Sequence, residues 1–165
     1  MIGEITVEVF IQPLDQHTLP QAVILRNHIF PKLGKLEHDT LSASLTPLKY
    51  HVHKKLGIKQ LEYWVAIHPG TREVVGLVGL YTQTDDNDGM IWLGWYCVDS
   101  DHRGLKIGKK LIGHAIEHAK EQKKKILHLY TTSGDEYATA RELYHNIGFK
   151  HYKSKSSELY YRLIL

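Results

Sequence analysis

The hydrophobic pattern at the start of the chain predicts one strand followed by a helix. Apolar and polar residues alternate from Ile5 to Val9, which is the period of a half-buried strand, and Pro13 ends it. Apolar residues then recur at helical spacing from Leu19 to Phe30. Pro31 stops this helix, because proline cannot continue the helical hydrogen bonds.

A second helix is expected between His38 and Leu56, although its pattern is irregular. Pro47 interrupts the spacing, so the helix must break or restart there, and Gly57 is placed to terminate it. The period then changes to that of strands, in runs rich in β-branched and aromatic residues that turn signals separate. These runs are Tyr63 to His68, Val74 to Tyr81 and Met90 to Val98. Their order predicts an antiparallel meander.

The rest of the chain alternates between helices and strands. Apolar residues at helical spacing from Ile107 to Ala119, with charged residues opposite them, predict an amphipathic helix with one buried face. Ile126 to Tyr130 is the next predicted strand. Tyr137 to Ile147 is the next predicted helix, which Gly148 ends as a left-handed cap.

Two short runs close the chain as a hairpin, Lys150 to Tyr152 and Leu159 to Leu163. Together the elements predict a mixed α/β (α+β) fold. We expect a central, mostly antiparallel mixed sheet of about six or seven strands, flanked by about four helices. No repeat, low-complexity tract or linker divides residues 1–165, so we expect a single domain.

Composition narrows the classes of function. Lysine and arginine number 21 against 18 acidic residues, and the net charge of +3 is too weak to predict a nucleic-acid partner. The single cysteine, Cys97, excludes an internal disulfide and a cysteine-rich zinc site, and it fits a reducing compartment. The N-terminus lacks the apolar core of a signal peptide, and no stretch approaches the ~20 apolar residues of a membrane span. We therefore expect a cytoplasmic protein with no membrane partner.

The most informative segment is the turn between a strand and the amphipathic helix, from Val98 to Gly108. Such a junction directs several unpaired backbone N–H groups at one point, and the helix dipole reinforces them, so it can bind an anion. Gly104 and Gly108 remove side chains where a phosphate must approach, and Arg103 adds positive charge. The pattern suits a pyrophosphate. It lacks the ending of a P-loop and the third glycine of the dinucleotide fingerprint.

This turn resembles the central motif of the GNAT superfamily of acyl-CoA-dependent N-acetyltransferases, in which Arg/Gln-x-x-Gly-x-Gly/Ala opens a helix after a strand. Arg103 to Gly108 follows the motif, with Lys106 in place of its first glycine. A second stretch, Ala140-x-x-Leu143-Tyr144-x-x-x-Gly148-Phe149, resembles the family's later helix, and Tyr137 takes the position of a frequent asparagine there. The order of the elements agrees over nearly the whole chain.

The resemblance implies acetyl-CoA as co-substrate and gives roles to particular residues. The strand before the turn splays from its neighbour, and the pantetheine arm pairs with the backbone of Tyr96, Cys97 and Val98. The Val98 N–H donates to the thioester carbonyl as it becomes an oxyanion. Tyr144 lies beside the sulfur and protonates the leaving thiolate, and Tyr137 neighbours the pantetheine. The pyrophosphate contacts are expected from Arg103, Gly104, Leu105, Lys106, Ile107, Gly108 and Lys109.

Other interpretations stay open for several of these residues. The strand residues Tyr96 to Val98 could be ordinary strand packing, and Tyr144 could be a core tyrosine. Cys97 could be imagined as an acyl-enzyme nucleophile, but no His/Asp constellation can be assigned to activate it, so direct transfer in a ternary complex is expected.

The segment His114-Ala115-Ile116-Glu117-His118 matches the inverted zincin pattern. Its position at the margin of an apolar helix face favours two boundary histidines, and no metal is expected.

The acceptor side is less well defined by the sequence. The strand from Ile91 to Tyr96 contains no carboxylate, so we expect the acceptor to lose its proton through water. Acidic residues between Asp85 and Asp88 could attract a cationic amine, or they could simply form a solvated hairpin turn. Several aromatic residues either line an acceptor pocket or belong to the core. They are Tyr50, Tyr63, Trp92 and Trp95.

The sequence thus predicts transfer of an acetyl group from acetyl-CoA to a primary amine, carried by a small molecule or a peptide. The alternative is a non-catalytic acyl-CoA-binding module on the same fold. Lys106 and Tyr137, the two departures from the motifs, keep that alternative open. Homodimers are common in the family, so the resemblance also leads us to expect a homodimer.

Overall fold

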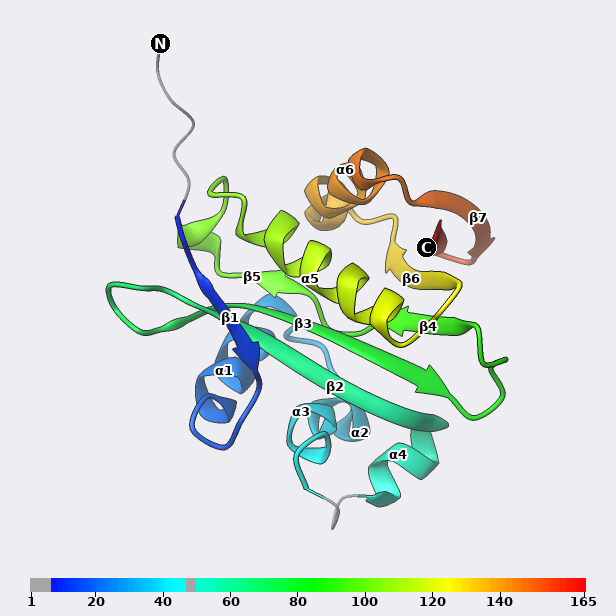
Figure 1. Ribbon diagram of the computed structural model, residues 1–165, viewed down its shortest axis with the longest axis horizontal. Coiled ribbons are helices and arrows are strands. Elements are labelled where there is room, and N and C mark those ends of the chain that lie inside the picture. Colours follow the sequence, from blue (N-terminus) through cyan, green and yellow to red (C-terminus); the bar gives the residue numbers. More distant parts are fainter. Residues whose placement is uncertain (1–6, 47–49) are drawn as a thin grey trace.

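The computed structural model describes residues 7–46 and 50–165, which form one mixed sheet with helices on both faces (Figure 1). The strands are β1 (Phe10–Pro13), β2 (Ile58–Ile67), β3 (Val74–Gln83), β4 (Met90–Leu93), β5 (Cys97–Val98), β6 (Ile126–Thr132), β7 (Lys150–Lys155) and β8 (Glu158–Ile164). The helices are α1 (Leu19–Ile29), α2 (Lys35–His38), α3 (Thr40–Ala43), α4 (Tyr50–Leu56), α5 (Ile107–Glu121) and α6 (Ala138–Ile147). The predicted mixed α/β fold is confirmed, with eight strands in the sheet.

Most neighbouring strands run antiparallel. Along the sheet the order is β1-β2-β3-β4-β6-β8-β7, and β5 pairs with β3. Among the described strands, β4 and β6 are the one parallel pair, and α5 makes the connection between them. A helix that connects parallel strands begins near the carboxyl end of the first strand. The turn before α5 therefore lies in the middle of the sheet, at the end of β5.

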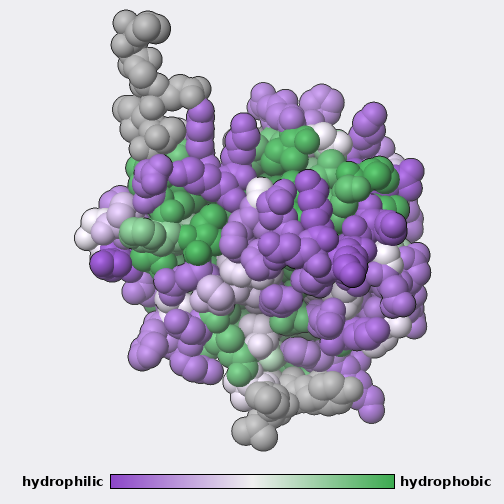
Figure 2. Space-filling model, in the orientation of Figure 1, coloured by the Kyte–Doolittle hydropathy of each residue, from purple (hydrophilic) through white to green (hydrophobic). Residues whose placement is uncertain are grey.

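The sheet carries a hydrophobic core on each face. α1 and α3 cover one face through Ala22, Leu25 and Leu41. α5 and α6 cover the other face. The buried residues of these two helices are Ile107, Leu111, Ile112, Ala115, Ala119 and Tyr144. The predicted buried face of the amphipathic helix is thus confirmed. On the face seen in Figure 2, hydrophilic residues predominate and apolar residues gather in separate patches.

The first strand lies later in the chain than the sequence predicts. The alternation from Ile5 to Val9 suggested a strand, but β1 begins at Phe10, and residues 1–6 lie outside the described part. Phe10 pairs with Ile67, the last residue of β2. Residues 7–9 therefore lie past the end of the partner strand, and the alternation alone could not reveal where that partner stops.

The region between α1 and β2 is more broken than predicted. Instead of one irregular helix that breaks or restarts at Pro47, the described residues form three short helices, α2, α3 and α4. Pro47 itself lies outside the described residues. Gly57 ends α4 with a positive φ of 68°, and Gly148 ends α6 with a φ of 118°, so both predicted terminators are confirmed. Within the described residues, no helix is both long enough and apolar enough to cross a membrane.

Candidate functional site

An irregularity splits the central predicted strand into β4 and β5. Leu93 pairs with Leu80 of β3, and Cys97 pairs with Leu77 of β3. Between these two pairs the β4–β5 segment advances four residues, whereas β3 advances three. The extra residue is a β-bulge, within which the Gly94 N–H donates to a β3 carbonyl at 2.7 Å. A bulge bends its strand, and this one keeps β5 on β3 while β4 pairs with β6. The sequence pattern did not reveal it.

The bulge opens a fork between β5 and β6. The parallel pairing of β4 with β6 runs from Met90 and Ile126 to Trp92 and His128. Beyond that last rung, β5 pairs with β3 while β6 pairs with β8. Trp92 and His128 therefore mark the closed end of the fork. The splayed strand that the family resemblance implied is present in this chain.

The open edge of β5 exposes backbone groups to the fork. The Asp99 N–H donates to the Val75 carbonyl on β3 at 2.9 Å. Successive residues of a strand direct their N–H groups to opposite edges, so the Val98 N–H points away from β3 and toward the fork. The Val98 carbonyl on the same edge accepts from Arg103 Nε at 3.4 Å. Cys97, by contrast, pairs inward with β3.

The start of α5 concentrates unpaired donors and positive charge. The first helical hydrogen bond runs from the Lys110 N–H to the Lys106 carbonyl at 3.1 Å, so the three N–H groups before Lys110 have no intrahelical acceptor. No side chain caps this end, and the first turn holds no acidic residue. Lys109 and Lys110 instead stand where the helix dipole disfavours positive charge. Such an end is suited to an external anion.

The turn keeps its glycine-like backbone despite the missing motif glycine. Lys106 has a φ of 62° and a ψ of 14°, which is the left-handed conformation that a glycine adopts at little cost. Gly104 has a φ of 77°, and a Cβ built there would have no neighbour within 4 Å. Leu105 is half-buried against the core, and Ile107 is fully buried. The chain therefore forms this turn with Lys106 at the position where the family motif has its first glycine.

Three predicted site residues come together between α5 and α6. A Cβ added to Gly108 would overlap the Tyr96 hydroxyl, so Tyr96 extends from the end of the bulge onto the first turn of α5. The Tyr96 ring lies 6.0 Å, centroid to centroid, from the ring of Tyr144 on α6. Burial raises the pKa of both phenols well above the usual value, so both keep their protons.

Tyr144 is the best enclosed of the predicted catalytic groups. It is 6% exposed and packs against Phe149 and Tyr161 as well as Tyr96. As a protonated phenol, Tyr144 can donate a hydrogen bond to an incoming atom. Its raised pKa makes Tyr144 a weak acid. It is therefore better suited to stabilise a thiolate by hydrogen bonding than to transfer its proton completely.

Tyr137 lies on the other side of the fork from the α5–α6 core. Its ring stacks on Phe30 at 6.2 Å, and Phe30 in turn lies 5.1 Å from Trp95 in the bulge. The Trp95 Nε1–H donates to Thr40 Oγ1 at 2.8 Å. The fully buried Arg26 fixes this wall, donating to the His38 carbonyl at 2.7 Å. Tyr137 thus joins an aromatic wall that the sequence had only partly identified.

The surroundings of Cys97 keep its thiol protonated. The thiol is buried, and this burial raises its pKa to about 12. The thiolate is the nucleophilic form of cysteine, and at neutral pH almost none is present here. These observations favour the buried strand thiol over the acyl-enzyme nucleophile.

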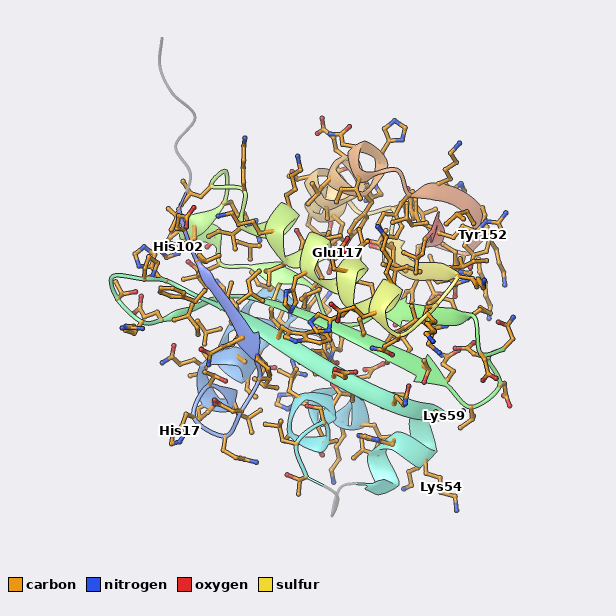
Figure 3. All side chains as sticks on the ribbon, in the orientation of Figure 1. His17, Lys54, Lys59, His102, Glu117 and Tyr152 are labelled. Carbon is orange, nitrogen blue, oxygen red and sulfur yellow. The ribbon has the colours of Figure 1, made fainter. Side chains whose placement is uncertain are left out.

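The three residues of the inverted zincin pattern do not meet at one point. The His114 and His118 rings lie 4.5 Å apart and pack against the Trp64 ring of β2, at centroid distances of 5.3 and 4.6 Å. Glu117 is 69% exposed and lies 3.4 Å from Lys120 Nζ, on the outward side of α5 (Figure 3). Within the described residues, no group of three or more potential metal ligands is present.

The acidic hairpin has an internal role. Asp86 Oδ2 accepts from the Gln83 N–H at 2.9 Å and from Trp92 Nε1 at 3.0 Å. This carboxylate orders the turn and anchors the indole. Trp92 and Tyr63 are buried in the core, whereas Trp95 is half-buried, and the side chain of Tyr50 lies outside the described part.

A groove and two buried residues were not anticipated from the sequence. The groove, of about 450 Å³, runs between α5 and α6 and is lined by Lys109, Gly113, Ile116, Leu143, Asn146 and Ile147. Arg26 and His128 are both buried, at 0% and 5% exposure. Arg26 falls on the apolar face of α1, which was a signal available in the sequence. His128 had only its place in an apolar strand, which does not distinguish a core histidine from a functional one.

Comparison with known proteins supports the family resemblance. The model of the acetyltransferase (GNAT) family matches residues 30–149. No curated protein sequence gives a significant match. An acetyltransferase of the GNAT family from Staphylococcus aureus Mu50 superimposes with a TM-score of 0.74 and 23% identity, over 96% of this chain and 99% of that one.

Two further solved structures share the fold at lower identity. PaiA N-acetyltransferase from Thermoplasma acidophilum, in complex with coenzyme A, has a TM-score of 0.70 and 14% identity, over 96% of this chain and 99% of that one. The ribosomal-protein-S18-alanine N-acetyltransferase from Escherichia coli has a TM-score of 0.66 and 17% identity, over 95% and 94% of the two chains. At such identities the likeness concerns the fold.

The match of the family model covers most of the chain and includes the forked strands, the turn and both helices that frame the site. The chain belongs to the acetyltransferase (GNAT) family.

Proposed function

We propose that this protein transfers an acetyl group from acetyl-CoA to a primary amine, by direct attack of the amine within a ternary complex. The observation that carries the proposal is the pairing of a strand fork with an uncapped, lysine-bearing helix start. The fork offers unpaired backbone groups to an extended arm, and the helix start offers donors to linked phosphates. Both features lie on one continuous segment, from Tyr96 to Lys109.

The turn would bind the pyrophosphate of acetyl-CoA. Arg103 is exposed beside it, and Lys109 stands at one end of the groove between α5 and α6. The groove leads away from the turn and has room for the nucleotide portion. The pantetheine arm would then enter the fork, along the free edge of Tyr96 to Val98.

Two groups in the fork suit the chemical step. The Val98 N–H points into the fork, where it can stabilise an oxyanion formed from the thioester carbonyl. Tyr144, with a protonated hydroxyl, can stabilise the sulfur as it leaves. The buried, protonated Cys97 supports direct transfer without an acyl-enzyme intermediate.

Relatives with the same fold support the substrate class. One solved neighbour is the NatC complex bound to Gag peptide and CoA, with a TM-score of 0.71 and 18% identity over 96% of this chain and 99% of that one. PaiA is named as an N-acetyltransferase and was solved with coenzyme A. We accordingly propose an amine on a small molecule or a peptide as acceptor. The homodimer and the cytoplasmic location stay predictions.

The experiment is a free-thiol assay with acetyl-CoA across amine classes, paired with titration calorimetry of coenzyme A. Amino acids, polyamines and peptides with free N-termini form the panel. Thiol release with one class and a measurable heat of coenzyme A binding are the expected results. Binding without release for every amine would favour the non-catalytic acyl-CoA-binding module instead. No heat and no release would refute both.

A further inference from the structure

His128 occupies a distinctive place at the closed end of the fork. It forms the last parallel rung with Trp92, immediately before β5 and β6 diverge. Leu127 and Leu129, its neighbours in β6, belong to the core under α5 and α6. Since successive side chains of a strand alternate between faces, the His128 imidazole lies on the opposite face of the sheet. That face is the one on which α1 and α3 pack.

The imidazole is held on one side and lacks a partner on the other. Its Nδ1 lies 3.0 Å from the Tyr152 hydroxyl of β7, and its ring lies 4.9 Å from that of Trp92. Figure 3 marks Tyr152 beside β7, the strand at the opposite end of the sheet from β1. The Nε2 atom is buried, and no group in residues 7–46 or 50–165 forms a hydrogen bond with it. Buried polar atoms are rarely left in this way without a function or an unseen partner.

The surroundings keep this histidine neutral. Burial is the main cause that lowers its pKa below the usual value, and the Arg162 guanidinium on β8 lowers it further. Asp86 opposes this shift, but its carboxylate is already engaged by the Trp92 indole. Four phenols also line this face, Tyr81 from β3, Tyr130 from β6, Tyr152 from β7 and Tyr160 from β8. Two charged groups are held at Tyr160, since Glu158 accepts from its hydroxyl and Lys153 lies over its ring. A neutral imidazole with a free ring nitrogen is a proton acceptor.

We propose that His128 is the general base of the acetyl transfer, a catalytic residue that takes a proton from the acceptor nitrogen at Nε2. This inference rests on the proposed function. An Nε2 base requires the Nδ1 atom to carry the ring proton, which it then donates to the Tyr152 oxygen. Tyr152 is accordingly a positioning residue that fixes the tautomer and the ring orientation.

The acceptor ammonium gives one proton to His128 Nε2, and the neutral amine forms a C–N bond with the thioester carbonyl carbon. The C–S bond breaks, and its electron pair leaves with the sulfur. The second proton of the amine ends on that sulfur, giving the free thiol of coenzyme A. His128 returns its own proton to solvent, so no further reactant is needed.

The test compares His128→Gln with His114→Gln. Both wild-type histidines have a buried Nε2 without a partner among the described residues, but His114 lies on α5, against the opposite face of the sheet. Turnover is measured by thiol release between pH 6 and 9, with the amine class that responds in the wild type. His128→Gln should lower kcat by about 10²-fold or more. It should also make kcat rise with pH across the range, with coenzyme A affinity unchanged, whereas His114→Gln should behave as the wild type.

A turnover and pH profile of His128→Gln equal to the wild type would overturn the assignment of His128 alone. If the wild type itself released no thiol with any amine, the proposed function would fail, and the base with it. A measurement on the unmodified protein guards against a variant that does not fold. In ¹⁵N-histidine NMR spectra at pH 7.5, His128 should be neutral with its proton on Nδ1. A protonated ring, or the proton on Nε2, would contradict the proposal.

Tyr152→Phe separates positioning from catalysis. Loss of the hydroxyl should lower kcat by about 3- to 10-fold, because a neutral hydrogen bond contributes about 1 kcal/mol. It should also shift the acid limb of the pH profile and increase the Nε2-protonated tautomer in the NMR spectrum. A lower kcat with unchanged pH profile and tautomer would show a structural role only, and would refute the positioning of His128 by Tyr152.

Discussion

Replacing Gly108 by alanine tests how tightly the forked strand is fitted to the start of α5. A Cβ at this position would overlap the Tyr96 hydroxyl and lie 3.4 Å from Tyr96 Cζ and 3.5 Å from Val98 Cγ2. Tyr96 packs against Tyr144, so its ring cannot move freely. Overpacking of this kind costs about 1–3 kcal/mol, while alanine in a helix regains about 0.5–1 kcal/mol over glycine. The net expectation is a loss of about 0.5–2 kcal/mol in the free energy of unfolding.

Thermal unfolding followed by circular dichroism measures this loss. For a chain of this size, it corresponds to a fall in Tm of about 1–8 °C. Gly113→Ala is the matched control, because it lies in the middle of the same helix and a Cβ there would have no neighbour within 4 Å. That variant should raise Tm by about 1–4 °C.

A double-mutant cycle with Tyr96→Phe isolates the contact. Removing the hydroxyl removes the overlap, so Gly108→Ala should cost little in the Tyr96→Phe background, with a coupling of about 1 kcal/mol or more. The reasoning is refuted if Gly108→Ala is as stable as Gly113→Ala. An equal loss in both backgrounds would likewise show that Tyr96 is not the cause.

Tyr144, Lys106, Cys97 and the two buried histidines can each be tested separately. Tyr144→Phe should lower kcat by about 10- to 150-fold, since a hydrogen bond to a charged group contributes about 1.5–3 kcal/mol; calorimetry should find coenzyme A affinity nearly unchanged, and unaltered turnover would remove Tyr144 from the mechanism. Lys106→Gly should leave Tm almost unchanged, whereas Lys106→Val should cost about 1–2 kcal/mol, because a β-branched residue resists a positive φ; equal melting of the two variants would count against the left-handed turn. The buried Cys97 thiol, with its pKa raised to about 12, should react with a disulfide reagent at least ~100-fold more slowly in the folded chain than in the unfolded one; comparable rates would contradict its burial. Burial lowers the pKa values of His114 and His128, so below about pH 6.5 these two histidines bind protons in the unfolded chain but not in the folded chain. The free energy of unfolding should therefore fall as the pH drops through this range. Chemical unfolding at about pH 7.5 and at about pH 5.5 tests the sign of this change.

Local patterns in the sequence predicted the elements that depend on local physics. The buried stripe of α5, the left-handed cap at Gly148 and the anion-binding turn each rest on residues within a few positions of one another. The turn was predicted even though Lys106 stands where a glycine is usual, and the structure shows that lysine adopts the required backbone. By contrast, β1 was placed too early, because its true start depends on where β2 ends.

The candidate site was only partly accessible from the sequence. The motif identified Tyr96, Val98 and Tyr144, and the structure brings the two tyrosines into contact across the fork. The buried Arg26 and the histidine at the closed end of the fork were not anticipated as part of it. Arg26 donates hydrogen bonds to the carbonyl groups of residues 37 and 38. These residues lie outside α1, so the helical spacing of α1 could not predict the contact.

By itself, the sequence determined the order of the elements, the donor-rich turn and the class of ligand that such a turn can bind. The tertiary structure alone decided that a bulge divides the central strand, that the fork closes at Trp92 and His128, and that His128 keeps one buried nitrogen without a partner among the described residues. The reason is physical. A turn or a helix face is fixed by neighbours in the chain, whereas a bulge, a strand register and the partners of a buried side chain are fixed by segments far apart in sequence.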